Sequence, residues 1–182
     1  SELADRFGVS RTPIREALQR LETQSMLVRD GRSMVVASLD HHQLAELYAV
    51  RAELEGLAAR LAARHATDEE VRVLRAMVEE DRRLANDPNA LARANRRFHH
   101  QIHLASHNRY LIQQLDLVHR SMALLASTSL AAEGRADATL QEHQAIIAAI
   151  TQRDGDTAAE AVKTHISRAY EMRLKLDAQQ PE

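Results

Sequence analysis

The chain has 182 residues, of which 45% are hydrophobic and only 3% aromatic, and its formal net charge at pH 7 is −2. With five glycines and three prolines it has few helix breakers, so the composition favours one or two small, mostly α-helical domains. The absence of cysteine excludes disulfides and thiolate metal sites, so any metal must be bound by histidine and oxygen donors. No apolar run approaches the length of a membrane span, and the N-terminus lacks the character of a signal peptide. We therefore expect a cytoplasmic protein with no membrane partner.

Two short helices are expected near the N-terminus. The first runs from Leu3 to Phe7 and ends at Gly8, and the second begins at Arg11 with Ser10 as its N-cap. The second helix has an apolar stripe formed by Ile14, Ala17, Leu18 and Leu21. Its other face carries Arg11, Thr12 and Arg15, which are residue types that contact phosphates and base edges. Two helices joined by a tight turn are typical of a helix-turn-helix, in which the second helix reads DNA.

A β-hairpin is predicted directly after these helices. Residues 26–37 read Met-Leu-Val-Arg-Asp-Gly-Arg-Ser-Met-Val-Val-Ala, which places two β-prone runs on either side of Asp30-Gly31. A hairpin in this position is typical of the wing of a winged helix.

Residues 3–18, Leu-Ala-Asp-Arg-Phe-Gly-Val-Ser-Arg-Thr-Pro-Ile-Arg-Glu-Ala-Leu, resemble the DNA-binding signature of the winged-helix regulators of the GntR family. The resemblance implies contacts to double-stranded operator DNA from Ser10, Arg11, Thr12, Arg15 and the wing residue Gly31. It also implies one more helix before Leu3, so we expect residues 1–38 to form a winged helix-turn-helix domain whose first helix is missing from this chain. Because only a few arginines carry the DNA affinity, we expect a homodimer that binds a palindromic operator.

Residues 39–182 are expected to form a second, all-helical domain. Amphipathic periodicity, the Thr67/Glu70 capping box and the Asp87-Pro88 pair predict six helices with short connections, and therefore an antiparallel six-helix bundle. The predicted helices run from His41 to Arg64, Asp68 to Asn86, Asn89 to Ser106, Arg109 to Leu130, Ala136 to Gln152 and Thr157 to Ala178.

Several polar residues fall on the apolar faces of these helices. Arg51 occupies a position where leucine is expected, and a buried arginine needs an anion, which is either Glu55 one turn later or an anionic ligand. Inward-facing imidazoles are expected from three different helices, at His99, His143 and His165. Hydrogen-bonded core histidines and ligands of a divalent transition metal would give the same pattern. Periodicity alone does not separate His99 from its neighbours His100, His103 and His107.

The helical part resembles the FCD effector-binding domain of the FadR subgroup of the same family. The resemblance rests on Arg-x-x-Leu-Glu at residues 51–55, on Phe98-His99 and on the 21 residues between His143 and His165. It implies that His99, His143 and His165 bind a divalent metal, with Asn95 where the family most often has aspartate. It leaves the other three histidines, His100, His103 and His107, on the surface or between helices.

The same resemblance implies the function. The metal would be zinc, with nickel or manganese as alternatives, and a small carboxylate effector would bind beside it with Arg51 nearby. The expected protein is a dimeric transcriptional regulator whose operator binding depends on that effector.

Two alternatives remain open. The helical part of the same kind of regulator could bind acyl-CoA or another bulky effector without metal. A metal-dependent hydrolase would also use three histidines and an open coordination position. The sequence contains neither His-Glu-x-x-His nor Glu-x-x-His and offers no evident general base, so we interpret the chain as a regulator and not as an enzyme.

Overall fold

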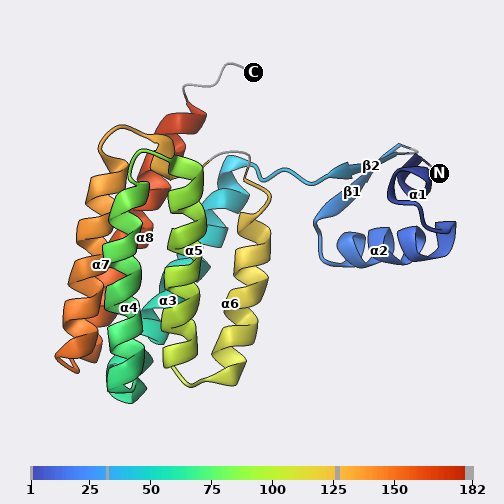
Figure 1. Cartoon of the computed structure of the whole chain (residues 1–182). Coiled ribbons are helices and arrows are strands. Elements are labelled where there is room, and N and C mark those ends of the chain that lie inside the picture. Colours follow the sequence, from blue (N-terminus) through green and yellow to red (C-terminus); the bar gives the residue numbers. More distant parts are fainter. Residues whose placement is uncertain (1, 32, 126–127, 179–182) are drawn as a thin grey trace.

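The computed structural model describes residues 2–31, 33–125 and 128–178, and in it the chain forms two parts joined by one extended segment (Figure 1). The head, residues 2–37, contains two helices and a β-hairpin, and the bundle, residues 41–178, contains six α-helices among the described residues. The predicted fold class is therefore confirmed: a winged helix-turn-helix head followed by a mostly antiparallel helical bundle.

The helices of the head are α1 (Glu2–Phe7) and α2 (Arg11–Thr23). Gly8 adopts a left-handed conformation with φ +64°, which lets the chain turn sharply between them. Ser10 is the N-cap residue of α2 as predicted, but its hydroxyl makes no capping hydrogen bond. The predicted apolar stripe is half-buried except at Ala17, which is exposed because it lies at the edge of the stripe.

The predicted hairpin is also present. Strands β1 (Leu27–Asp30) and β2 (Ser33–Val36) are antiparallel, with Leu27 opposite Val36 and Asp30 opposite Ser33. Gly31 follows β1 with φ +59°, a conformation that β-branched residues strongly disfavour. An ion pair between Arg29 Nε and Glu22 Oε1, at 2.8 Å, holds the hairpin against the end of α2.

The bundle contains six α-helices and two short 3₁₀ turns. They are α3 (His41–His65), α4 (Asp68–Asp81), η1 (Arg82–Leu84), α5 (Pro88–Ala105), α6 (Arg109–Met122), η2 (Ser129–Ala131), α7 (Arg135–Thr151) and α8 (Gly155–Asp177). The capping box of Thr67 and Glu70 is formed, and Asp87 caps α5 with Pro88 in its first turn.

Two predicted helices are too long. The helix expected to continue to Leu130 ends at Met122, and part of the predicted span, residues 126–127, lies outside the described residues. Farther along the predicted span, the Thr128 hydroxyl accepts a hydrogen bond from the amide of Leu130, a local side-chain bond of the kind that competes with helix. The helix expected to reach Asn86 ends at Asp81, and the chain continues as the 3₁₀ turn η1.

Helix α3 is the centre of the bundle and packs most extensively against α8. The contact face of α3 consists of small residues, of which Ala58, Ala59, Ala62 and Ala63 are fully buried. Gly56 belongs to the same face, and a Cβ atom there would lie 2.9 Å from the Lys163 side chain on α8. Small residues such as Gly56 thus let the backbones of α3 and α8 approach closely.

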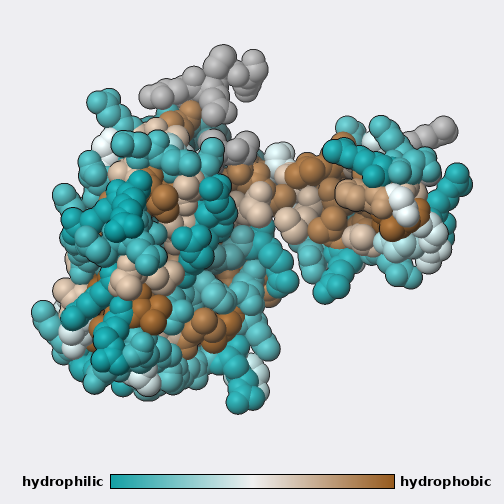
Figure 2. Space-filling model, in the orientation of Figure 1, coloured by the Kyte–Doolittle hydropathy of each residue, from teal (hydrophilic) through white to brown (hydrophobic). Residues whose placement is uncertain are grey.

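The surface of the head is notably apolar for its size. Figure 2 shows hydrophobic side chains gathered over it, and Phe7 and Val36 are 66% and 70% exposed. Among the described residues, no helix has the length and apolar character needed to cross a membrane.

Candidate metal centre and adjoining pocket

Three imidazoles meet inside the bundle. His99 on α5, His143 on α7 and His165 on α8 are 0%, 1% and 3% exposed, and each offers a ring nitrogen within 4.8 Å of those of the other two. The inward faces of α5, α7 and α8 each carry one of these imidazoles, at the same level of the bundle. The structure therefore brings together the three histidines that the sequence resemblance singles out.

Two glutamates orient two of these imidazoles. Glu55 on α3 accepts a hydrogen bond from His99 Nδ1, and Glu142 on α7 accepts one from His165 Nδ1 at 2.6 Å. Carboxylates in these places favour the tautomers with hydrogen on Nδ1, which leaves both Nε2 atoms as acceptors. The two Nε2 atoms face each other at 3.1 Å.

All three imidazoles are neutral near pH 7. Burial lowers the pKa of His99 to about 3, and burial also lowers the pKa of His143 and of His165. The pKa of Glu142 is about 2: burial raises it, but the hydrogen bond from His165 and the charge of Arg135 outweigh that effect. Burial likewise raises the pKa of Glu55, but His99 and Arg51 hold it well below its usual range.

The arrangement fits a metal ion. Two neutral imidazoles whose Nε2 lone pairs face each other at 3.1 Å repel one another unless a cation lies between them. Zinc–nitrogen bonds of about 2.0–2.1 Å at a tetrahedral angle would separate two such nitrogens by about 3.3 Å. The donor set therefore suits a small divalent ion with little movement of His99 or His165.

His143 completes the triangle in a different way. Its ring stacks on Phe98 with 4.0 Å between centroids, and neither ring nitrogen has a hydrogen-bond partner in the described part of the chain. Leaving both nitrogens of a buried imidazole unpaired costs free energy, and a bound ion or ligand at His143 would remove part of that cost. Asn95 Oδ1 is also buried without a partner among the described residues, and the side chain lines the cavity beside His165.

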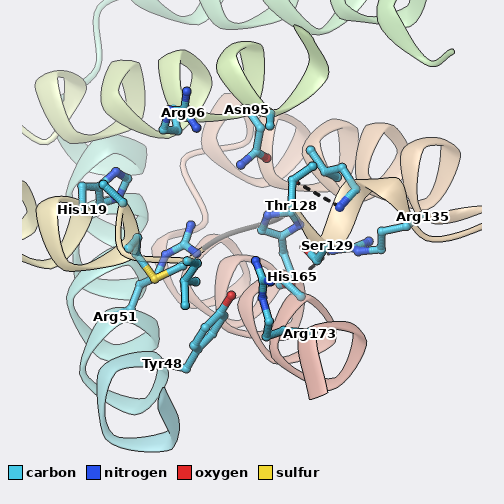
Figure 3. A pocket seen from close by; sticks show the side chains of 16 residues that line it. Tyr48, Arg51, Asn95, Arg96, His119, Thr128, Ser129, Arg135, His165 and Arg173 are labelled. Atoms are coloured by element: carbon cyan, nitrogen blue, oxygen red, sulfur yellow. Dashed lines mark hydrogen bonds between the residues drawn. The ribbon is translucent and has the colours of Figure 1, made fainter. Parts of the chain in front are cut away.

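That cavity has a volume of about 490 Å³ and opens next to the histidines (Figure 3). It is lined from α3 by Tyr48 and Arg51, from α5 by Asn95 and Arg96, and from α8 by His165 and Arg173. Arg51 is 6% exposed and donates from Nε to Glu55 at 2.8 Å. The internal partner considered for Arg51, Glu55, is therefore present, and the same side chain lines the cavity.

Sequence reasoning missed several members of the site. Glu142, Arg135 and His119 were not singled out, although Arg135 and Glu142 are seven residues apart on α7 and therefore share a face of the helix. Arg135 donates to Glu142 at 2.8 Å, and His119 lies 3.2 Å from Glu55. The seven-residue Arg/Glu spacing was the available signal for the first pair, but nothing local marked His119.

The remaining histidines divide between core and surface. His100 is exposed, and His107 pairs with Glu70 at the surface at 3.0 Å. His103 lies between helices with 1% exposure, and its Nε2 is 3.5 Å from Glu55. Glu55, His99 and His103 also form a group of metal-ligand type. The charge of Glu55 is already balanced by Arg51, so this second group is a weaker cation site than the three histidines.

The residues proposed to contact DNA all belong to the head. Arg11, Thr12 and Arg15 are exposed along the first turns of α2, and the hydroxyl of Ser10 is not used for capping. Gly31 lies at the turn of the hairpin. Side chains at the N-terminus of a helix and an adjacent hairpin form the surface that a winged helix applies to a duplex.

Comparisons with known proteins agree with this architecture. Residues 1–36 match the model of the gntR family of bacterial regulatory proteins, and residues 46–168 match that of the FCD domain. An HTH-type transcriptional regulator of Bacillus subtilis is 31% identical over 94% of this chain and 78% of its own length. The galactonate operon transcriptional repressor of Escherichia coli is 28% identical over 92% of this chain and 82% of its own.

A solved structure supports the same fold. McbR of Escherichia coli superposes with a TM-score of 0.84 at 22% identity, covering 97% of this chain and 85% of that one. Both halves of the sequence, and their order, correspond to one kind of bacterial regulator. The chain therefore belongs to the GntR family of bacterial regulatory proteins, and its helical part is an FCD domain.

Proposed function

We propose that this transcriptional regulator binds a small organic acid beside a divalent metal in its FCD domain, and that this ligand controls operator binding by the head. In this proposal residues 1–38 are the DNA-binding domain and residues 39–182 the effector-binding and dimerisation domain. His99, His143 and His165 hold the metal, with help from Asn95, and zinc is the first candidate, followed by nickel and manganese.

The observation that carries the proposal is the pair of neutral imidazoles with opposed Nε2 atoms at 3.1 Å, each oriented by a glutamate. Hydrogen-bonded structural histidines would not leave two lone pairs facing each other, nor both nitrogens of His143 unpaired among the described residues. These features favour the metal-dependent regulator over one that holds a bulky effector without metal.

When bound, the metal would supply a positive charge and an open coordination position for a carboxylate. Arg51 lines the same cavity, so its terminal N–H groups can bind that carboxylate while its Nε remains on Glu55. The ligand would then tie α3, α5, α7 and α8 together. The ligand can shift the equilibrium between two arrangements of the DNA-binding heads only by the difference in its binding free energy for the two.

Two further points support an organic acid and a DNA partner. Relatives of the chain are named for operons of organic acids, galactonate and L-lactate dehydrogenase. The exposed arginines of α2 and the wing suit a palindromic duplex read by a homodimer in the cytoplasm.

The test is metal analysis of untagged protein purified without chelator, followed by a thermal-shift screen of small organic acids. We expect about one divalent ion per chain, and acids that raise the melting temperature only while the ion is present. A metal-free preparation that responds equally to the acids, or responds only to acyl-CoA, would contradict the proposal.

A further inference from the structure

The cavity beside the histidines is strongly cationic. Four arginines line it, one from each of α3, α5, α7 and α8: Arg51, Arg96, Arg135 and Arg173. Among the described residues that line it there is no aspartate or glutamate. A concave site lined by charges of one sign concentrates ions of the opposite sign, so its ligand is an anion.

The carboxylates that balance these arginines lie outside the cavity lining. Glu55 holds Arg51, Glu142 holds Arg135, and Asp177 lies 3.7 Å from Arg173. These pairs fix the guanidinium groups in place while their cationic faces line the cavity. Arg96 differs, because it is exposed and pairs with no acid in the described part of the chain.

The proposed metal donors are all neutral, which adds to the positive charge. Imidazole binds a metal ion as the neutral ring, and Asn95 supplies an amide oxygen where a carboxylate would have brought a negative charge. The two positive charges of a divalent ion would therefore be unbalanced by its protein ligands. Because a buried net charge is costly, the ligand must supply about two negative charges.

The positions of the arginines show where a second anionic group would bind. In Figure 3, Arg96 projects from α5 on the side of the cavity opposite Arg173 and Tyr48, with His165 between them. A monocarboxylate bound at the histidines leaves Arg96 without an anion. Because Arg96 and His165 line the same cavity, a ligand with a second carboxylate has an anion to offer Arg96.

We propose that the effector is an organic acid with at least two carboxylates, one bound at the metal and Arg51 and another at Arg96. This inference rests on the proposed metal and organic-acid site and specifies its ligand class.

The experiment compares acids that differ only in the second carboxylate. Zinc-loaded protein is titrated with butyrate against succinate, and with 2-hydroxybutyrate against malate, at equal ionic strength. The zinc content is measured after each titration, so that removal of the metal by the acid is detected. Arg96→Gln is compared with Arg93→Gln, which removes an exposed arginine from the same helix that does not line the cavity.

We expect at least one dicarboxylate to bind about tenfold more tightly than its matched monocarboxylate, as for an added charge-assisted hydrogen bond. Arg96→Gln should reduce that ratio by about fivefold, the upper value for an exposed ion pair, and Arg93→Gln should leave it unchanged. Asn95→Asp should also reduce the ratio, because it supplies one of the two negative charges.

Equal affinity for mono- and dicarboxylates, or an equal effect of Arg96→Gln and Arg93→Gln, would overturn the inference and leave the proposed organic-acid site standing. If no acid of either class binds the zinc-loaded protein, the proposed organic-acid function fails, and the inference fails with it.

Discussion

Replacing His143 by alanine separates a metal ligand from a structural core histidine. The imidazole is 1% exposed and stacks on Phe98, but neither of its nitrogens has a partner among the described residues. In metal-free protein, His143→Ala loses the packing of the ring and at the same time removes two unsatisfied buried polar atoms. These effects oppose each other, so the metal-free variant should be no more than mildly destabilised.

The expected effect of the substitution differs in size between metal-free and zinc-loaded conditions. A large-to-small core substitution costs about 2–5 kcal/mol, and each buried unpaired polar atom that it removes returns about 1–3 kcal/mol. The metal-free melting temperature should therefore change by only a few degrees. In wild type, metal at a hundred times its dissociation constant adds about 2.7 kcal/mol. For a chain of this length that is a rise of about 5–10 °C.

The assay is thermal unfolding by circular dichroism of chelator-treated protein, with and without added zinc. His143→Ala should abolish the rise that zinc causes in wild type. His103→Ala is the matched control, because His103 is equally buried but points to Glu55 rather than to the three-histidine group, and it should keep the rise. If His103→Ala loses the zinc effect and His143→Ala retains it, the ligand assignment is wrong.

Three other outcomes are expected. Asn95→Asp should tighten zinc binding, since it gives the ion an anionic oxygen ligand. Competition with a fluorescent chelator measures the zinc affinity, and an unchanged affinity would mean that residue 95 does not reach the metal. Arg11→Ala and Arg15→Ala should each weaken binding to operator DNA at constant salt without changing the melting temperature of the bundle. Gly31→Val should also weaken DNA binding, through strain at the wing turn. Fluorescence anisotropy measures the affinity, and parental affinity for both arginine variants would refute the assignment of α2 as the DNA-reading helix. The metal-free protein should lose stability in acid, because burial lowers the folded-state pKa of His99 from 6.5 to about 3. The contribution of neutral His99 to the free energy of unfolding is therefore complete above pH 6.5 and falls by about 1.4 kcal/mol per pH unit below that. Urea midpoints at pH 7.0 and 5.5 test this, and zinc should reduce the loss.

The acid lability has a single sign because Glu142 acts in the same direction as His99. Its folded-state pKa of about 2 lies below the ordinary value of 4.5, so it too stabilises the fold above its unfolded pKa and less below it. An apparent stability maximum near pH 5 would contradict the burial of neutral imidazoles.

Much of the fold was determined locally, and those parts were predictable from the sequence. Gly8 marks a tight turn, Asp30-Gly31 a hairpin, and the Thr67/Glu70 pair the start of a helix, because each acts through backbone conformation or hydrogen bonds within a few residues. Helix ends that lack such a signal, at Asp81 and Met122, were placed too late. Periodicity also placed Arg51 and the three histidines on inward faces, and their assignment as metal ligands came from resemblance to the family.

Only the tertiary structure decided which polar groups meet. Glu55 and His99 are 44 residues apart in the chain, and His99 and His165 are 66 apart. They come together because α5 and α8 both pack against α3 in the folded bundle. Arg135 and Glu142 share α7, but the four arginines around the cavity come from four different helices, so no local pattern links them. Burial and charge at this site are properties of the packed bundle, because they depend on which faces of the helices exclude water together.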